Sequence, residues 1–592
     1  MREHESKISK ECKVNPKGFW KYVNSKLKRS TGISNLVKPD GNITESDEEK
    51  AELLNSFFSS VFTKEDTNNI PSLNKRNNNQ FICDTILTRQ AVQNKLNKLD
   101  TSNSTGPDKI PALILKTLSL EISLPLRIIF NKSLEEGTLP KDWKVAEVTG
   151  IFKKGSKSDP GNYRPVSLTS IICKVLESFV KNSIQEYMET NKFFTDCQHG
   201  FRGKRSCVTQ LLEAMNDFTN LIDNSNCIDV IYMDFAKAFD KVPHQRLLNK
   251  MSAYGIEGNL LKWISSFLSE RCQRVKVNNS YSSFSTVNSG IPQGSVLGPL
   301  LFVIFINDLP ENVFNLCKIF ADDTKIYNDD SKHEELQRDL LALLKWSDKW
   351  QLKFNSSKCS VLHIGRRNKR NVYYMDQEKT IILNSTESEK DVGVTFTENF
   401  KFDTHIGNIV NKANQMTGII KRSFSYLDVP MFTKLFKSIV RPHLEYANVI
   451  WHPVYKKQQF KLECVQRRAT KILKEFKDFT YSERLKALDL PSIKYRQIRA
   501  DLIQSYKILH DIDNIKKEDF FELSSTNITR NSHHLKLFKP YAKSMVRSNF
   551  LPNRIIDLWN KLSPSCRDST NMLSFKKSVD FELSHLKYEY YS

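Results

Sequence analysis

The chain has 592 residues, of which 39% are hydrophobic and 26% are charged, and its formal net charge is +22. This composition excludes a disordered chain, and the length allows about three or four structural units with cores of their own. Residues 401–592 contain 34 Lys and Arg against 19 Asp and Glu, a net charge of +15. This excess indicates either a soluble basic surface or a polyanionic partner such as nucleic acid.

The cysteines and the apolar segments exclude several other classes. The 11 cysteines are scattered, without a Cys-x-x-Cys pair or a Cys/His cluster, so we expect neither a structural zinc site nor a disulfide framework. The longest apolar run, near "PLLFVIFI", is far shorter than the roughly 20 residues of a membrane helix, so no membrane partner is expected. The charged start "MREHESKISKEC" does not resemble a signal peptide. We expect an intracellular protein, in the nucleus and cytoplasm.

In chain order, three parts are predicted. Residues 1–84 should form a helical extension, in which "EEKAELLNSFFSSVF" is the clearest amphipathic segment, followed by a polar linker at 64–80. Helix and strand signals alternate over residues 85–396, and residues 397–592 are basic and mostly helical. The predicted class is therefore α+β.

The stretch "KIFADDTKIY" places Asp322 and Asp323 side by side between two strand-like segments. This pattern predicts a tight hairpin with the acidic pair at or beside its turn. Two unit charges about 4 Å apart repel by roughly 4 kcal/mol at an effective dielectric of 20, so solvent or a cation must compensate them. A second pair, in "NDD" at 328–330, leads into polar sequence and is interpreted as a solvated loop. A pair of neighbouring aspartates therefore does not by itself indicate a functional site.

Asp234 supplies the missing context, because it ends the apolar run "VIYM". A carboxylate at the end of a buried strand is costly unless it is paired or binds a metal. If that strand lies beside the hairpin, three carboxylates meet although 88 residues separate Asp234 from Asp322. Carboxylate oxygens suit Mg²⁺, and two such ions can hold an attacking 3′-hydroxyl and a leaving pyrophosphate.

Longer motifs add a resemblance to a known family. "DFAKAFDKVPH", "SGIPQGSVLGPLLFVIFINDL" and "FADD" resemble a reverse transcriptase of the non-LTR retrotransposon (LINE-type) class, most of all the jockey-like group. Further blocks extend the resemblance over nearly the whole chain: "VTGIFKKGSKSDPGNYRPVSLTSIICKVLE", "QHGFRGKRSC", "NSSKCSVLHIG", "VRPHLEYANVIW" and "VQRRATKI". The resemblance implies a right-hand polymerase with fingers, a palm on a mostly antiparallel sheet, a helical thumb, and helical extensions at both ends.

The implied activity is RNA-directed DNA polymerisation. The chain would add deoxynucleotides to a primer 3′-end by two-metal phosphoryl transfer, using an RNA template, a DNA primer, dNTPs and two Mg²⁺ ions. Asp234 and Asp322 resemble the metal-bridging carboxylates, Asp323 is the third carboxylate, and the carbonyl of Phe235 would add a ligand. Lys358, in "NSSKCS", resembles a lysine proposed to protonate the departing pyrophosphate; the alternative is a surface lysine.

The resemblance also implies a nucleotide site. Phe239 would lie under the sugar of the incoming nucleotide and exclude a 2′-hydroxyl; the alternative is a core phenylalanine. Gln293 belongs to "GIPQGSVLGP", a loop that enters a helix, and would lie near the nucleotide and template. Lys153, Lys154 and Arg164 would neutralise the triphosphate, since phosphoryl transfer depends on positioning and charge; either lysine could instead be a solvated surface residue.

Further positions would contact the primer and template, along the hairpin, a "DVGVTF" segment and a basic thumb helix. These are Phe320, Val392, Gly393, Arg467, Arg468 and Lys471. Two aspartates depart from the family pattern: Asp391 stands where an apolar residue is more frequent, and Asp403 where a tryptophan is common. Neither is expected to touch the chemistry.

Full-length elements of this group carry an endonuclease before the polymerase, and the residues ahead of the linker are too few to hold one. We therefore expect a chain that lacks its endonuclease domain, with a nick supplied in trans. Two alternatives stay open. One is an inactive remnant that only binds nucleic acid, against which the intact set of three aspartates counts. The other is a different right-hand polymerase, such as an intron maturase or an RNA-copying enzyme. Phe239 counts against ribonucleotide use, and the lack of a recognisable maturase or homing-endonuclease tail counts against the intron maturase.

Overall fold

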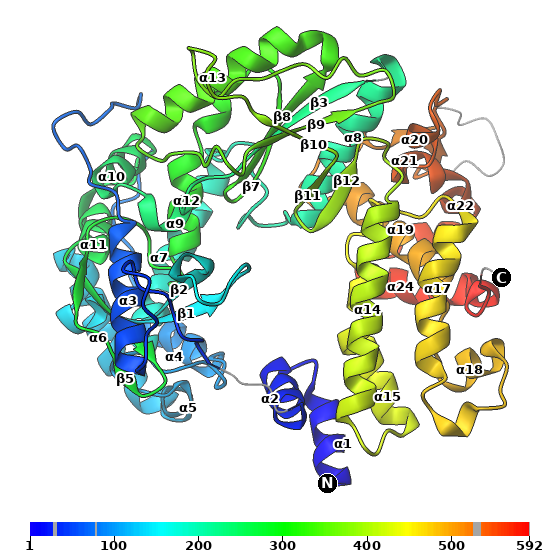
Figure 1. Cartoon of the computed structure of the whole chain (residues 1–592), viewed down its shortest axis with the longest axis horizontal. Helices are drawn as coiled ribbons and strands as arrows, with labels where there is room; N and C mark the ends of the chain where they lie inside the picture. The colour runs from blue at the N-terminus through cyan, green and yellow to red at the C-terminus, as the bar shows by residue number, and fades with distance from the viewer. Residues whose placement is uncertain (28–31, 77–79, 226, 525–533, 591–592) are drawn as a thin grey trace.

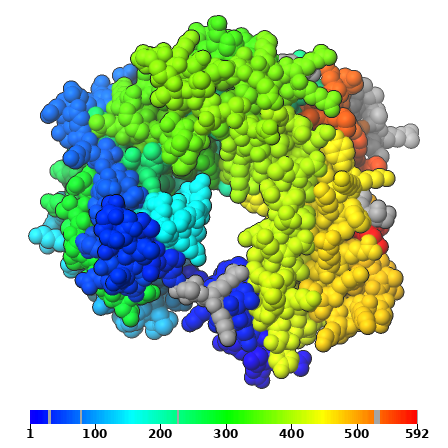
Figure 2. Space-filling view, in the orientation of Figure 1, coloured from blue at the N-terminus to red at the C-terminus, as the bar shows by residue number. Residues whose placement is uncertain are grey.

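The computed structural model describes residues 1–27, 32–76, 80–225, 227–524 and 534–590. Sheets and helices from the first two thirds of the chain form the left and upper parts of the molecule in Figure 1, and helices of the last third form the right part. An opening passes between these parts, as Figure 2 shows in the space-filling view. The predicted mixture of helices and strands, followed by a helical region, is confirmed.

A five-stranded sheet lies at the centre of the chain, with strand order β10–β9–β3–β8–β7. All its neighbouring pairs are antiparallel except β9 with β10. Its strands are β3 (Ile228–Met233), β7 (Leu316–Phe320), β8 (Asp323–Asp329), β9 (Ser360–Ile364) and β10 (Asn384–Thr386). Strand β3 occupies the middle and is almost wholly buried, because it consists of apolar and β-branched residues with a buried Asp229.

A second sheet lies nearer the N-terminus of the chain. Strand β1 pairs antiparallel with β2 and parallel with β4, and β4 also pairs with β5 and β6. The strands are β1 (Val145–Phe152), β2 (Tyr163–Leu168), β4 (Arg271–Val277), β5 (Ser280–Tyr281) and β6 (Ser285–Val287). Helix α3 (Asp47–Ser60) covers this sheet, and its Leu54 and Phe58 share a core with Val148 and Val275.

Helices α8 (Cys207–Ser225) and α13 (His333–Lys349) pack against the central sheet. Four further helices share a hydrophobic core with its Ile231 and Ile326: α7 (Ile171–Thr190), α10 (His244–Ala253), α11 (Gly258–Leu268) and α12 (Gly298–Ile306). Helix α12 is apolar all round, and every residue from Leu300 to Ile306 is at most 1% exposed, as expected of a helix inside a core. Pro299 lies in its first turn, where a missing N–H costs little.

The last third of the chain is helical, apart from the short pair β13 (Glu522–Leu523) and β14 (Leu537–Phe538). Its main helices are α14 (Asp403–Ser423), α15 (Val429–Leu435), α17 (Lys456–Thr470), α19 (Ile493–Leu509) and α24 (Met572–Glu582). The N-terminal helices α1 (Arg2–Glu11) and α2 (Pro16–Lys26) pack against α15 and α14, where Phe19 and Val23 are fully buried. Within the described part of the chain, no helix has the length and apolar character needed to cross a membrane.

The polar stretch 64–80, predicted as a linker, has no helix or strand in its described residues, and residues 77–79 lie outside the described residues. It is anchored to the fold, because the Glu65 carboxylate accepts the backbone N–H of Arg246 (2.9 Å) and pairs with its guanidinium (3.2 Å). The expectation that the "NDD" pair is a solvated loop was wrong. Asp329 ends strand β8, and Asp330 is buried and accepts the N–H of Lys369.

Candidate active site

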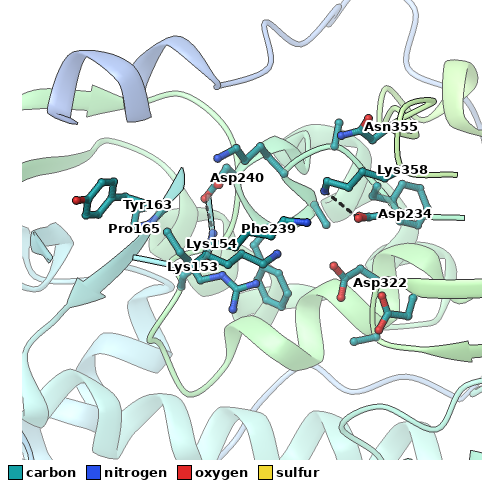
Figure 3. A pocket seen from close by; sticks show the side chains of 18 of the residues that line it. Lys153, Lys154, Tyr163, Pro165, Asp234, Phe239, Asp240, Asp322, Asn355 and Lys358 are labelled. Carbon is teal, nitrogen blue, oxygen red and sulfur yellow. Dashed lines mark hydrogen bonds and ion pairs between the residues drawn. The ribbon is translucent and has the colours of Figure 1, made fainter. Parts of the chain in front are cut away.

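A cavity of 710 Å³ lies between the central and the second sheet (Figure 3). Most of the residues singled out from the sequence line it, although they come from positions far apart in the chain. They are Lys153, Lys154, Arg164, Asp234, Phe235, Phe239, Gln293, Phe320, Asp322, Asp323 and Lys358. The fold thus brings the proposed metal, nucleotide and proton-transfer residues to one place.

The acidic pair lies on the predicted hairpin. Strands β7 and β8 pair antiparallel with Phe320 opposite Asp323, which leaves Ala321 and Asp322 as a two-residue loop. In the neighbouring pair β3–β8, Met233 lies opposite Thr324, so the next residue, Asp234, comes beside Asp323. The hairpin and its neighbouring strand therefore bring the three carboxylates to the same end of the sheet, as the sequence predicted.

The electrostatics of the hairpin carboxylates reflect this crowding. Burial and the charge of Asp234 raise the pKa of Asp322, against the cations Arg164 and Lys153. Although Asp323 is exposed at the mouth of the cavity, desolvation of its carboxyl and the charge of Asp322 raise its pKa to about 7. Both shifts disfavour the charged carboxylates and would be reversed by a bound cation.

Asp234 is held differently from its two neighbours. Its Oδ2 accepts a hydrogen bond from Lys358 Nζ at 2.8 Å, the dashed contact in Figure 3. Its carbonyl accepts the N–H of Asn355 at 2.7 Å, which fixes the turn that carries Lys358. Among the described residues, no three His, Cys, Asp or Glu side chains are gathered closely enough to form a ready metal site. The lysine is the counter-ion of Asp234 in this arrangement.

The residue set nevertheless fits hard divalent cations. The donors are carboxylate oxygens, which Mg²⁺ prefers. The raised pKa values of Asp322 and Asp323 indicate negative charge that the protein leaves incompletely compensated. Asp234, Asp322 and Asp323 would hold such ions, with the carbonyl of Phe235 at the same cavity.

Phe239 and Gln293 form the floor of the predicted nucleotide site. The ring of Phe239 stacks on Phe302 with centroids 4.8 Å apart, and it is half-buried with its remaining surface on the cavity. Gln293 Nε2 donates to Asp240 Oδ1 at 2.7 Å. Gly294 has φ of 125°, and a Cβ there would collide with the carbonyl of Ser167, so the loop must be glycine to lie against strand β2.

The cations of the cavity come mainly from the second sheet. Arg164 lies in β2, Lys153 and Lys154 follow β1, and all three are exposed. Sequence reasoning missed Lys237 and Asp240, which also line the cavity. Lys237 is half-buried, and its Nζ lies 3.4 Å from the carbonyl of Gly161. The sequence could have indicated both Lys237 and Asp240, because they belong to the same "DFAKAFD" motif as Asp234.

The predicted primer and template residues beyond Phe320 lie outside this cavity. Val392 and Gly393 form the turn between β11 (Ser388–Asp391) and β12 (Val394–Thr397), and Tyr446 Oη donates to the Val392 carbonyl at 2.7 Å. The basic residues of the predicted thumb helix are exposed at the end of α17: Arg467, Arg468 and Lys471. Figure 1 shows α14, rather than α17, nearest the opening.

Asp391 does not line the cavity, but an ion pair ties it to the strand that follows the acidic hairpin. The Lys325 ammonium donates to Asp391, and the two side chains are only 2% and 3% exposed. Lys325 lies two residues after Asp323 in strand β8, and the charge of Asp391 contributes to the raised pKa of Asp323. A long-range ion pair therefore connects the β11–β12 hairpin to the catalytic strand.

The reverse transcriptase (RNA-dependent DNA polymerase) family matches residues 151–427, a range that contains the central sheet and nearly all the cavity residues. The mixed fold is compatible with a polymerase. Residues 151–427 are therefore similar to a reverse transcriptase domain.

The curated relatives of the chain include polymerases of mobile elements. The chain is 27% identical to a probable RNA-directed DNA polymerase from transposon BS of Drosophila melanogaster, over 65% of this chain and 44% of that protein. It is 27% identical to the RNA-directed DNA polymerase from mobile element jockey of the same species, over 64% and 43%. The probable RNA-directed DNA polymerase from transposon X-element of that species is 25% identical, over 62% and 42%. The chain thus aligns with less than half the length of these relatives.

Proposed function

We propose that this chain is an RNA-directed DNA polymerase that extends a primer 3′-end with deoxynucleotides. One observation carries the proposal: Asp234, Asp322 and Asp323 lie at one cavity, and the cations of the second sheet line the same cavity. Phosphoryl transfer requires carboxylates that can hold metal ions and, facing them, cations that can neutralise a triphosphate.

The architecture fits a polymerase hand around the opening in Figure 2. In this proposal the second sheet forms the fingers, the central sheet the palm, and α14 with the helices behind it the thumb. Helix α14 carries exposed basic residues, including Lys412 and Arg422, and the net charge of residues 401–592 is +15. A duplex of template and primer would pass through the opening, with backbone contacts that do not depend on sequence.

Asp234, Asp322, Asp323 and the Phe235 carbonyl would hold two Mg²⁺ ions. When bound, such ions stabilise the attacking and leaving oxygens of an in-line displacement. The metal-binding role requires Asp322 and Asp323 in their charged form and requires Asp234 to exchange its lysine contact for a metal contact. In this proposal the Lys358 ammonium neutralises Asp234 when no metal ion is bound there.

The remaining residues would orient the nucleotide. Arg164 and the lysines after β1 would neutralise the triphosphate, and the Phe239 ring would close the space that a 2′-hydroxyl needs. Gln293 Nε2 donates to the Asp240 carboxylate, and this bond would orient the amide so that its oxygen is available to the nucleotide. Lys358, released from Asp234, would stand close enough to the phosphates to donate a proton to pyrophosphate.

Primer extension tests the proposal. Purified full chain is given an RNA template, a DNA primer, dNTPs and Mg²⁺, beside Asp322→Asn and the control Asp329→Asn at the far end of the same strand. We expect extension by the wild type and the control, none by Asp322→Asn, and similar duplex binding by all three. Residual extension by Asp322→Asn at ordinary Mg²⁺ would refute the metal assignment.

The same assay separates the proposal from the binding-only alternative. A wild-type chain that binds the duplex tightly and in a salt-sensitive way, yet extends no primer, would be a nucleic-acid-binding remnant.

A further inference from the structure

The turn that presents Asp322 is not favoured by its own sequence. Two-residue hairpin loops prefer Gly or Asn where φ is positive, but Ala321 occupies that position here with φ of 55°. An alanine keeps such a conformation only when its surroundings hold it there. The contacts of Ala321 therefore bear on how the catalytic carboxylates are placed.

A segment from a distant part of the domain runs beside strand β7. Gln198 forms a parallel bridge with Ile319, in which the N–H of Ile319 donates to the Cys197 carbonyl (2.8 Å) and the N–H of His199 donates to the Ile319 carbonyl (2.9 Å). This backbone pairing ends before the turn. Beyond it, the hydrogen bonds to the turn come from a side chain.

The Gln198 carboxamide continues the ladder onto Ala321. Its Oε1 accepts the backbone N–H groups of Ala321 (2.9 Å) and Gly200 (2.7 Å), and its Nε2 donates to the Ala321 carbonyl (3.4 Å). The side chain thus pairs with both backbone groups of the residue before Asp322, as a neighbouring peptide would. Gln198 is 1% exposed, so water cannot readily replace these bonds.

Gly200 makes this close approach possible. A Cβ at this position would collide with the backbone nitrogen of Ala321. The "QHG" sequence therefore supplies both the carboxamide and the space that it needs beside the turn. Gln198 does not line the cavity, so it acts on the carboxylates only through the backbone of the hairpin.

We propose that Gln198 is a positioning residue for the catalytic turn: its carboxamide holds Ala321 in the left-handed conformation that directs Asp322 and Asp323 to the metals. The inference deepens the proposed polymerase function and rests on it. A carboxamide is suited to the task because it offers an acceptor to two N–H groups and a donor to one carbonyl. Methionine has a similar size and offers no strong donor or acceptor.

The experiment compares full-length wild type, Gln198→Met and Gln210→Met. Gln210 is a matched control, because it is also 1% exposed and its carboxamide oxygen has no hydrogen-bond partner among the described residues. We expect Gln198→Met to slow single-turnover extension at saturating dNTP by about 10- to 100-fold, the scale of a small misplacement of reacting groups. The Mg²⁺ concentration for half-maximal rate should rise, while duplex affinity matches that of Gln210→Met and the far-UV circular dichroism of both variants matches that of the wild type.

A rescue variant separates positioning from general damage. Glycine adopts positive φ readily, so Ala321→Gly added to Gln198→Met should recover a large part of the lost rate. Two results would overturn the proposal: an extension rate for Gln198→Met within about threefold of wild type, or a slow variant that Ala321→Gly fails to improve.

A second readout does not depend on polymerase activity. Hydrogen exchange in Gln198→Met should quicken at the amides of Gly200 and Ala321 and remain unchanged in helix α8. If the wild type extends no primer, the proposed function fails, but faster exchange confined to the turn would still support the positioning role. Unchanged exchange at both amides would refute it.

Discussion

Loss of the Asp391 carboxylate should destabilise the protein by about 3–5 kcal/mol, the usual cost of breaking one side of a buried ion pair. The Lys325 and Asp391 side chains are 2% and 3% exposed, and burial lowers the pKa of Lys325 despite its partner. In Asp391→Leu the ammonium would remain buried near the ring of Phe218 without a counter-ion. The cost is therefore mainly the desolvation of an unpaired charge.

A double-mutant cycle measures this cost by equilibrium unfolding in urea. The variants are Asp391→Leu, Lys325→Met and the double substitution. We expect each single variant to lose several kcal/mol and the double variant to lose about 1–2 kcal/mol or less, because two apolar side chains can fill the same site without desolvating a charge. The reasoning would be refuted if Asp391→Leu cost less than about 1 kcal/mol, or if the double variant lost the sum of the two single losses.

The pH dependence of Asp391→Leu gives a second check on the same pair. A buried lysine whose pKa is below its unfolded value of about 10.4 binds fewer protons in the folded than in the unfolded state. Stability therefore rises with pH between the folded and the unfolded pKa. Since removal of Asp391 lowers the pKa of Lys325 further, the rise should be steeper in the variant than in the wild type, and absent when Lys325→Met is added.

Three further outcomes are expected. Phe239→Ala should raise ribonucleotide incorporation relative to deoxynucleotides in competition assays; unchanged sugar selection would make the ring a core residue only. Lys358→Met should slow single-turnover extension by about 10²–10⁴-fold if the lysine is the proton donor, with a shallower rate increase toward acidic pH. The folded pKa of Asp323, about 7, exceeds the ordinary 3.8, so the folded state binds more protons between these values. Stability of the metal-free protein should fall as pH rises through this window, and the Mg²⁺ concentration for half-maximal extension should fall between about pH 6 and pH 8. Asp323→Asn should remove its contribution to the stability change, which thermal melts with and without Mg²⁺ would detect.

Local patterns predicted the central features of the site. The run "KIFADDTKIY" specified two short strands with a turn between them, and "VIYM" before Asp234 specified a buried strand that ends in a charge. Both depend on neighbours in sequence, which is where strand propensity and turn chemistry act. The meeting of these segments across 88 residues came from the resemblance and from the cost of an unpaired carboxylate, and the register of β3 with β8 accounts for it.

Features that depend on long-range partners could not be predicted from the sequence. Asp391 departs from the family pattern without a local reason, because its partner, Lys325, is 66 residues away. Nothing in the sequence around Lys325 distinguishes it from an ordinary charged strand residue. Glu65 lies in a polar stretch typical of a linker, yet it caps and pairs with Arg246, 181 residues further on. Gln198 carries no charge and no metal-binding potential, so nothing local indicates that its amide holds a catalytic turn.

The distribution of charge in the cavity suggests how the site changes when substrates bind. The acids come from the central sheet and the segment after it, and the cations mainly from the second sheet and its loop. The acids are Asp234, Asp240, Asp322 and Asp323, and the cations are Lys153, Lys154, Arg164, Lys237 and Lys358.

Lys358, which precedes strand β9 of the central sheet, donates directly to Asp234. If Asp234, Asp322 and Asp323 held metal ions, the Lys358 ammonium would no longer be needed as the counter-ion of Asp234 and would be attracted to the anionic phosphates of a nucleotide. Under the proposal that Lys358 is the proton donor, metal binding and the placement of this donor would therefore be coupled. Lys358→Met should then both slow extension and lower the Mg²⁺ concentration for half-maximal rate.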